Sequence, residues 1–384
     1  MEFDFSAEQK QLKNEARRFL ADRCGRDAVR AVLDGPASTD RALWRRLGEL
    51  GFLGAAIPEE YGGIGAGYLE ACVLAEELGR AVAPVPYASS IALAAECLML
   101  AGSEQQKRRW LPLLASGAAI GKLAGIDGPG PHAFTLPATS VRAGGRGLVV
   151  DGRKLPVADG DIADFALVPV RDDAGALSLT LIELGDPGVT RRTLESIDPT
   201  RSQAELVFAD VAAEPLGAAG EGGRILERVF DRAAVLIAFE QLGGAERALE
   251  MARDYAQERF AFGRPIGSLQ AVKHMLADMY VSATLARSNC YYGAWALSTN
   301  ATELAQAAAT ARVSATQAYQ HCARNNIQVH GGMGFTWEFD CHLYYRRSNL
   351  LAAVLGPLSH WEDRLVQCLV DARTPTTALA GAAQ

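Results

Sequence analysis

The chain has 384 residues, which at about 100–200 residues per domain predicts two or three domains. Hydrophobic residues make up 49% and charged residues 22% of the sequence, a composition that excludes disordered and fibrous proteins. The formal net charge is −7 and no basic block is present, which argues against non-specific nucleic-acid binding. No run reaches the ~18 uncharged apolar residues that a membrane-spanning helix needs.

The seven cysteines lie far apart and form no Cys-x-x-Cys pair, and the histidines are not placed at metal-ligand spacing. This pattern predicts reduced, mostly buried thiols and no metal site. The acidic start Met1-Glu2-Phe3-Asp4 does not resemble a signal or transit peptide. We therefore expect a cytoplasmic protein.

Residues 1–120 show helical periodicity. Helix starts are marked by cap residues, namely the capping-box pairs Ser6–Gln9 and Ser103–Gln106, and Thr39 or Asp40. Further helices are predicted over 68–78 and 87–100. This region is expected to form an N-terminal helical domain.

Residues 121–222 differ, because Gly and Pro become frequent and the apolar runs shorten. Short strands bounded by turn residues are predicted over 147–150, 165–170, 177–183 and 204–208. This region is expected to form a small β-domain.

Residues 223–384 return to long helical periods. Apolar stripes predict helices over 225–244, over 272–283 after a cap at Ser268, and over 303–328. Long helices joined by short links favour an antiparallel bundle. The tail after Arg373 is rich in Thr, Ala and Gly and is expected to be loose.

Two segments carry candidate chemistry, residues 255–270 and 328–335. Arg259 offers a planar guanidinium suited to a diphosphate, and Phe262 a ring that can stack on an aromatic base. The Gly331-Gly332-Met333-Gly334 stretch lets backbone N–H groups approach a ligand closely. Taken singly, each segment is equally well explained as a helix end followed by an ordinary loop.

Together, in this order, the two segments resemble the acyl-CoA dehydrogenase family of flavoproteins. The Ala7-Glu8-Gln9 helix and the turn over 58–63 resemble the family as well. The resemblance implies a mainly α, α+β fold with an N-terminal helical domain (1–120), a central β-barrel or sandwich domain (121–222) and a C-terminal four-helix bundle (223–384). It also implies FAD as cofactor, held at a subunit interface. The residues it assigns to a neighbouring chain's FAD are Arg259, Phe262, Gln270, Gln328, Gly331 and Gly332.

The implied reaction is the α,β-dehydrogenation of an acyl-CoA thioester. A carboxylate in a dry pocket removes the α-proton, the flavin takes the hydride, and an electron-transfer flavoprotein reoxidises the flavin. The sequence departs from this pattern, because Leu355 and Ala233 occupy the two positions where relatives keep the carboxylate. Glu240 is the remaining candidate base, since it lies on the apolar stripe of its helix; the alternative is a buried Glu paired with an Arg.

The flavin-facing half also departs from the family. The loop over 124–132 lacks the usual Gly-Ser-Asp, and Leu155-Pro156-Val157 replaces a Trp-Ile-Thr segment. An intact neighbour-reaching half and an altered flavin-facing half resemble the small subunits of heteromeric steroid side-chain or pimeloyl-type acyl-CoA dehydrogenases. The chain is therefore expected to form a homo-oligomer or a heterotetramer with a second such chain. Alternatives are a non-catalytic partner that completes another chain's FAD site, and a relative with other flavin chemistry, such as a monooxygenase or desulfinase.

Overall fold

The computed structural model describes residues 5–128, 137–145 and 147–373. The tail predicted to be loose begins at 374 and lies outside the described residues, as do residues 129–132 of the altered loop. No helix within the described ranges is long and apolar enough to cross a membrane.

Helices form the N-terminal region. They are α1 (Ala7–Arg23), α2 (Arg26–Leu33), α3 (Arg41–Glu49), α4 (Tyr68–Arg80), the π-helical segment η3 (Ala88–Ala95), α5 (Glu96–Ala101) and α6 (Glu104–Ala115). Both predicted capping boxes are present, at Ser6 and Ser103, and the Asp40 carboxylate accepts from the Leu43 N–H to cap α3. The predicted helix over 87–100 is continuous in space but changes from π to α geometry at Glu96.

A mixed sheet follows. Its strands are β1 (Gly121–Leu123), β2 (Ser140–Gly144), β3 (Gly147–Ala158), β4 (Phe165–Arg171), β5 (Leu177–Glu183), β6 (Val189–Leu194) and β7 (Gln203–Leu216). The four predicted strands correspond to β3, β4, β5 and β7, and all four are longer than or equal to their predicted ranges. Pairings run β4-β2-β3-β7-β5 and return to β4, which closes this part of the sheet into a barrel.

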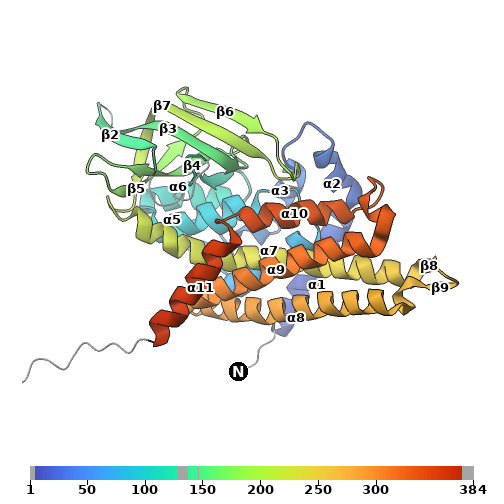
Figure 1. Ribbon diagram of the computed structural model, residues 1–384. Coiled ribbons are helices and arrows are strands. Elements are labelled where there is room, and N and C mark those ends of the chain that lie inside the picture. The colour runs from blue at the N-terminus through green and yellow to red at the C-terminus, as the bar shows by residue number, and fades with distance from the viewer. Residues whose placement is uncertain (1–4, 129–136, 146, 374–384) are drawn as a thin grey trace, which may run out of the picture.

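The C-terminal region is a bundle of long helices. Its elements are α7 (Gly222–Glu258), the hairpin β8 (Phe260–Ala261) and β9 (Arg264–Pro265), α8 (Gln270–Ser298), α9 (Leu304–His330), α10 (Cys341–Ala353) and α11 (Leu358–Arg373). Figure 1 shows α7, α8 and α9 lying side by side, with the hairpin at the end remote from the sheet. The fold class implied by the resemblance is therefore confirmed.

One predicted cap in the bundle is wrong. α8 begins at Gln270 after the N-cap Leu269, and Ser268 belongs to a short 3-10 turn. The Ser268 hydroxyl donates to the carbonyl of Pro265, 2.7 Å away, and so stabilises the turn that enters the helix.

Candidate functional site

A pocket of about 370 Å³ lies where the barrel meets the helices, and we call it the central pocket. The β-domain contributes β1 with the residues after it, the end of β3 and the segment after β6, while the helices contribute η3, α7 and the end of α10. Most of its lining is apolar, including Leu93, Ile126, Phe230 and Val354. Such a lining excludes water from a bound ligand and strengthens electrostatic interactions there.

Leu355, at the family's usual base position, lines this pocket. It has a positive φ of 64° and is followed by Gly356 at φ 93°, so the chain turns sharply after α10. The indole of Trp361 donates to the Leu355 carbonyl over 3.0 Å. The guanidinium of Arg312 donates to the carbonyls of Leu351 and Val354 at the end of α10, over 2.5 Å to each. These bonds fix the segment that carries Leu355.

Ala233 is buried in α7 one turn after Phe230, which does line the pocket. Both of the usual carboxylate positions therefore lie at or beside the pocket and carry aliphatic side chains. Within the described residues, the one carboxylate that lines the central pocket belongs to Glu195, an exposed residue just after β6.

Sequence reasoning missed Lys122, which also lines the pocket and is 7% exposed. Burial lowers the pKa of its ammonium group to about 8, while the charge of Asp159 opposes the shift. Its strand β1 is three residues long and pairs in parallel with β4, so it has too few residues to show an alternating pattern. In the sequence, the feature that could have indicated Lys122 is its charge within an otherwise apolar run, residues 118–124.

Asp127 lies in the described part of the altered loop, residues 124–128, and is held by several contacts. Its carboxylate accepts from the N–H and hydroxyl of Thr139, both within 3.1 Å, and pairs with the ammonium of Lys154. The N–H of Leu155 donates to the carbonyl of Ile126 over 2.7 Å. Thus the two departures from the family pattern lie next to each other, and Ile126 and Pro156 both face the central pocket.

Glu240 is 4% exposed and lies in a buried ion-pair cluster. Its carboxylate is 3.5 Å from a guanidinium nitrogen of Arg201 and 3.4 Å from one of Arg347. Arg347 also pairs with Asp198 over 2.6 Å, and Arg201 with Asp159 over 3.2 Å. This is the geometry of the alternative in which a buried Glu is paired with Arg, and Glu240 is not among the residues lining the central pocket.

The residues that the sequence resemblance assigns to a neighbouring chain's FAD gather at the free end of the bundle. Arg259 and Phe262 lie at and in the β8–β9 hairpin, Gln270 begins α8, and Gln328 and the two glycines lie at the end of α9. The ring of Tyr255, at the end of α7, stacks on His330 with centroids 4.1 Å apart, which ties the two motifs together.

These residues are open to solvent. Phe262 is 90% and Phe335 81% exposed, and the Arg259 side chain has no hydrogen-bond or ion-pair partner in the described part of the chain. A Cβ placed on Gly331 or Gly332 would meet nothing within 4 Å. A guanidinium, an aromatic ring and uncovered glycine backbone thus form one accessible surface, which we call the bundle end.

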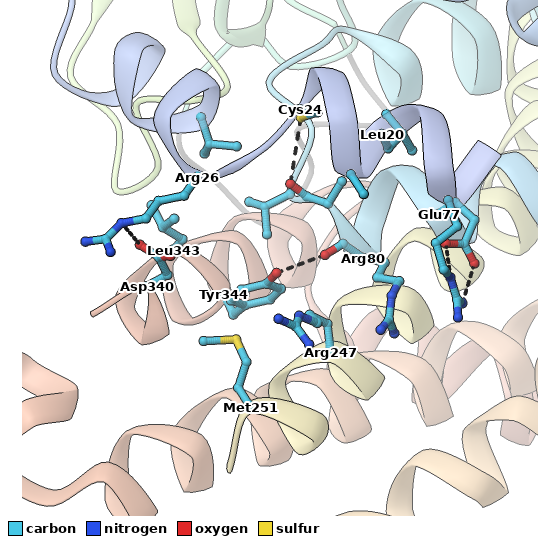
Figure 2. Close-up of a pocket in the computed structure, with 15 residues that line it drawn as sticks. Leu20, Cys24, Arg26, Glu77, Arg80, Arg247, Met251, Asp340, Leu343 and Tyr344 are labelled. Carbon is cyan, nitrogen blue, oxygen red and sulfur yellow. Dashed lines mark hydrogen bonds and ion pairs between the residues drawn. The ribbon is translucent and has the colours of Figure 1, made fainter. Parts of the chain in front are cut away.

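A second cavity, of about 420 Å³, lies between α1, α2, α4, α7 and α10 (Figure 2). Its charged side chains form ion pairs: Arg17 with Glu77, Arg26 with Asp340, and Arg80 and Arg247 with Glu250. The Tyr344 hydroxyl donates to the Arg80 carbonyl over 2.9 Å. Since every guanidinium lining it has a carboxylate partner, this cavity is a charged junction between helices, and it holds no sequence-predicted site residue.

The comparison with known proteins decides the family. Residues 6–118 match the description "Acyl-CoA dehydrogenase, N-terminal domain" and residues 220–358 match "Acyl-CoA dehydrogenase, C-terminal domain". The chain belongs to the acyl-CoA dehydrogenase family. It is 35% identical to the acyl-CoA dehydrogenase IpdE2 of Mycobacterium tuberculosis, over 91% of this chain and 93% of that protein. FadE27 of the same organism is 35% identical over 83% of this chain and 85% of its own length.

Solved acyl-CoA dehydrogenase structures agree. The Tcur3481-Tcur3483 steroid acyl-CoA dehydrogenase has a TM-score of 0.86 at 31% identity, covering 95% of this chain and 98% of that one. The ChsE4-ChsE5 complex of Mycobacterium tuberculosis has a TM-score of 0.87 at 29% identity, covering 98% and 100%.

FAD is the cofactor of acyl-CoA dehydrogenases, and this chain's residues fit it in two places. The bundle end offers Arg259 without a partner and glycines with open space around them, which suits a diphosphate. The central pocket offers a largely apolar hollow against the β-domain, which suits a flat ring system. The two places lie on different parts of the chain, because the bundle end is remote from the sheet (Figure 1) whereas the central pocket lies where the barrel meets the helices.

Proposed function

We propose that this chain is a subunit of an FAD-dependent acyl-CoA dehydrogenase in which its bundle end completes the cofactor site of a neighbouring chain. The observation that carries this proposal is the exposure of the bundle end. Phe262 and Arg259 lie exposed at the β8–β9 hairpin, and burying such a surface against a partner is favourable. Exposed apolar side chains on α8, at Tyr280, Val281 and Leu285, also support an oligomer.

The proposed reaction is the α,β-dehydrogenation of an acyl-CoA thioester. When bound, FAD supplies the two-electron oxidation. The chain's own residues bind and orient: Arg259 pairs with a diphosphate, Phe262 stacks on an aromatic base, and the apolar central pocket keeps water from the acyl group. An electron-transfer flavoprotein is the proposed electron acceptor, and the cytoplasm the proposed compartment.

Two features support a heteromer rather than a homo-oligomer. Leu355 and Ala233 provide no carboxylate at the usual base positions, whereas a different partner chain can provide one in its own pocket. The similar structures include a complex of two distinct chains, ChsE4 and ChsE5, and a steroid acyl-CoA dehydrogenase named by two chains. In this arrangement the bundle end of our chain reaches the partner's FAD.

A second candidate function is a non-catalytic partner subunit. The aliphatic side chains at Leu355 and Ala233 favour it, because a pocket without a proton acceptor cannot itself remove an α-proton. In that case the chain stabilises FAD on the other subunit and contributes no reaction centre of its own.

Co-expression tests the proposal. The chain is purified alone and together with a second acyl-CoA dehydrogenase-like chain from the same genome, and flavin content and bleaching by acyl-CoA are measured. We expect flavin to be retained and bleached only by the pair. A flavin-replete, active homo-oligomer of the lone chain contradicts the heteromer, and a pair that binds no flavin contradicts the whole proposal.

The same preparation separates the two candidate functions. An inactivating substitution at the partner's base position leaves residual bleaching only where this chain's pocket is itself catalytic. Complete loss of bleaching with flavin still bound supports the non-catalytic role.

A further inference from the structure

Lys122 is the feature of the central pocket that the family resemblance does not account for. Its side chain is 7% exposed and faces a pocket whose other deep lining residues include Leu93, Phe230 and Leu355. An ammonium group in such surroundings loses part of its hydration, and this costs free energy unless another charge or an acceptor replaces the water.

No such replacement is present within residues 5–128, 137–145 and 147–373. The Lys122 ammonium makes neither a hydrogen bond nor an ion pair with any described residue. The nearby carboxylate of Asp159 already accepts from the hydroxyl of Ser89 and from the guanidinium of Arg201. Arg201, the other cation close to Lys122, pairs with both Asp159 and Glu240, so the carboxylate nearest Lys122 is already shared with another cation.

Lys154, in the same domain, is a buried lysine whose ammonium group has both a hydrogen-bond acceptor and an ion-pair partner. It is fully buried, donates to the carbonyl of Pro169 over 2.7 Å, and pairs with Asp127. It does not line the central pocket. The fold thus provides partners for a buried ammonium group where it is structural, and leaves one without partners where it faces the pocket.

A ligand bound in the pocket is in a position to supply the missing partner of Lys122. The group that best compensates a desolvated ammonium is an oxyanion, because it brings both opposite charge and hydrogen-bond acceptors. Glu195 does not fill this role, since it is exposed at the pocket and forms no ion pair with Lys122. FAD does not fill it either in this assignment, because the residues suited to its phosphates lie at the bundle end and its oxidised ring, which the pocket also suits, carries no charge.

We propose that Lys122 is a specificity residue, and that the central pocket selects acyl-CoA thioesters whose acyl group carries a carboxylate or another oxyanion. The inference rests on the proposed function, because it takes the acyl group to be the ligand beside Leu355. It adds the chemical class of that acyl group, which neither the fold nor the cofactor motifs contain.

Paired thioesters test the proposal. Glutaryl-, adipoyl-, suberoyl- and sebacoyl-CoA are compared with pentanoyl-, hexanoyl-, octanoyl- and decanoyl-CoA, in the purified oligomer that contains this chain. Binding is measured by calorimetry and turnover by dye reduction. We expect at least one carboxylated member to be preferred over its unsubstituted match, and Lys122→Met to lower that preference about tenfold or more.

Two further variants make the result specific. Lys122→Arg keeps the charge and should retain part of the preference, whereas Lys107→Met, which removes a cation from α6 away from the pocket, should change nothing. Equal losses for both thioesters in Lys122→Met, or an unchanged preference, overturn the proposal. A shifted flavin spectrum or potential with unchanged preference also overturns it, because the ammonium then serves the cofactor.

Failure of the proposed function has a different signature. If no thioester of either series binds or bleaches the flavin, the pocket is not an acyl site, and both proposals fall. If unsubstituted thioesters bind and are oxidised while carboxylated ones are not preferred, only the specificity inference falls.

Discussion

The two buried lysines of the β-domain, Lys122 and Lys154, are similarly buried, but only Lys154 has hydrogen-bond and ion-pair partners. Burial lowers the pKa of both ammonium groups, and hydrogen bonding with Asp127 opposes the shift at Lys154. At Lys122 the unfavourable free energy of desolvation is poorly offset, because Asp159 attracts the ammonium group without a hydrogen bond or ion pair to it. Residues kept for a ligand often carry such a cost in stability.

Replacing each lysine by methionine should therefore change stability in opposite directions. At neutral pH we expect Lys122→Met to raise the free energy of unfolding by about 1–3 kcal/mol, because an uncompensated buried charge is replaced by an apolar side chain. Lys154→Met should lower it by about 2–4 kcal/mol, because Asp127 loses its partner. Urea unfolding of the ligand-free chain measures both; a loss of stability at Lys122 would mean that its ammonium has a partner.

The stabilisation by Lys122→Met should depend on pH. The folded-state pKa of about 8 lies below the ordinary value of 10.5, so between these values the unfolded chain binds more protons than the folded one. The penalty in the native protein is full below pH 8 and is relieved as the pH rises to about 10.5. The charged groups facing Lys122 are Asp159 and Arg201, with Glu195 across the pocket.

The measurement is the difference in unfolding free energy between Lys122→Met and the native chain across this pH range. The difference should shrink as the pH rises from about 8 to about 10.5. A difference that stays constant would show that the lysine is not protonated differently in the two states.

Glu240 can be tested by a near-isosteric change. Glu240→Gln keeps the shape but removes the charge that balances Arg201 and Arg347, so we expect it to lose about 2–4 kcal/mol of stability. Turnover of the purified oligomer should remain within a few-fold of native. Turnover abolished in a variant that still folds and binds flavin would establish the catalytic role instead.

At the residue scale, candidate functional residues could be predicted only where a local sequence pattern exists. Arg259 and the glycines at 331–332 are predicted site residues because each lies in a recognisable motif, and their role stays a prediction. The state of Lys122 depends on residues that are distant in the chain, namely Ser89, Asp159 and Arg201. Whether a charge is partnered is a property of tertiary packing, and no spacing rule predicts it.

At the scale of elements, the crossing of α4 and α7 depends on small residues. A Cβ at Gly79 would overlap the carbonyl of Glu240, and a Cβ at Gly243 would overlap the carbonyl of Glu76. The two helices therefore approach until backbone meets backbone, and this contact sets where the N-terminal domain lies on the bundle.

Gly243→Ala should destabilise the chain by about 3 kcal/mol or more, because rigid backbone must move apart to admit the methyl group. Gly223→Ala, near the start of the same helix, is the matched control. A Cβ there meets only a side-chain atom of Leu177 at 3.7 Å, so higher helix propensity should stabilise by up to about 1 kcal/mol. Thermal unfolding distinguishes them, and equal effects at both sites would contradict the close approach.

Element prediction succeeded where a signal is local. Caps at Ser6, Asp40 and Ser103 were predicted because a side chain and an N–H three residues away determine them. The cap at Ser268 was wrong, since a 3-10 turn uses that hydroxyl instead. The strands β1, β2 and β6 were not predicted, because short strands are stabilised by their sheet neighbours rather than by their own pattern.

At the scale of the whole molecule, the sequence predicted that two distant segments act together, and the structure brings them to one end of the bundle (Figure 1). Helix length and antiparallel packing cause this, because α7 ends, α8 begins and α9 ends at the same place. The division into domains at residues 120 and 222 stays a prediction, although strands β1 to β7 fall between 121 and 216.

The bundle-end residues Arg259 and Phe262 should affect FAD binding without affecting the stability of the lone chain. Arg259 and Phe262 make few contacts in their own chain, so Arg259→Met and Phe262→Ala should change the lone chain's unfolding free energy by less than about 0.5 kcal/mol. In the oligomer, the same variants should lose FAD during dialysis at least about tenfold faster, because the diphosphate and base lose their partners. The rate of FAD loss is measured by the fluorescence of the released flavin.

Arg253→Met is the control, since Arg253 lies exposed on the preceding turns of α7 and pairs with Asp254 over 2.6 Å. It removes the same charge from the same helix without touching the bundle end, and should leave FAD retention unchanged. Equal flavin loss in Arg253→Met and Arg259→Met would mean that only overall charge matters. Unchanged retention in both bundle-end variants would place the cofactor elsewhere, because neither the guanidinium nor the ring would then contact it in the assembled protein.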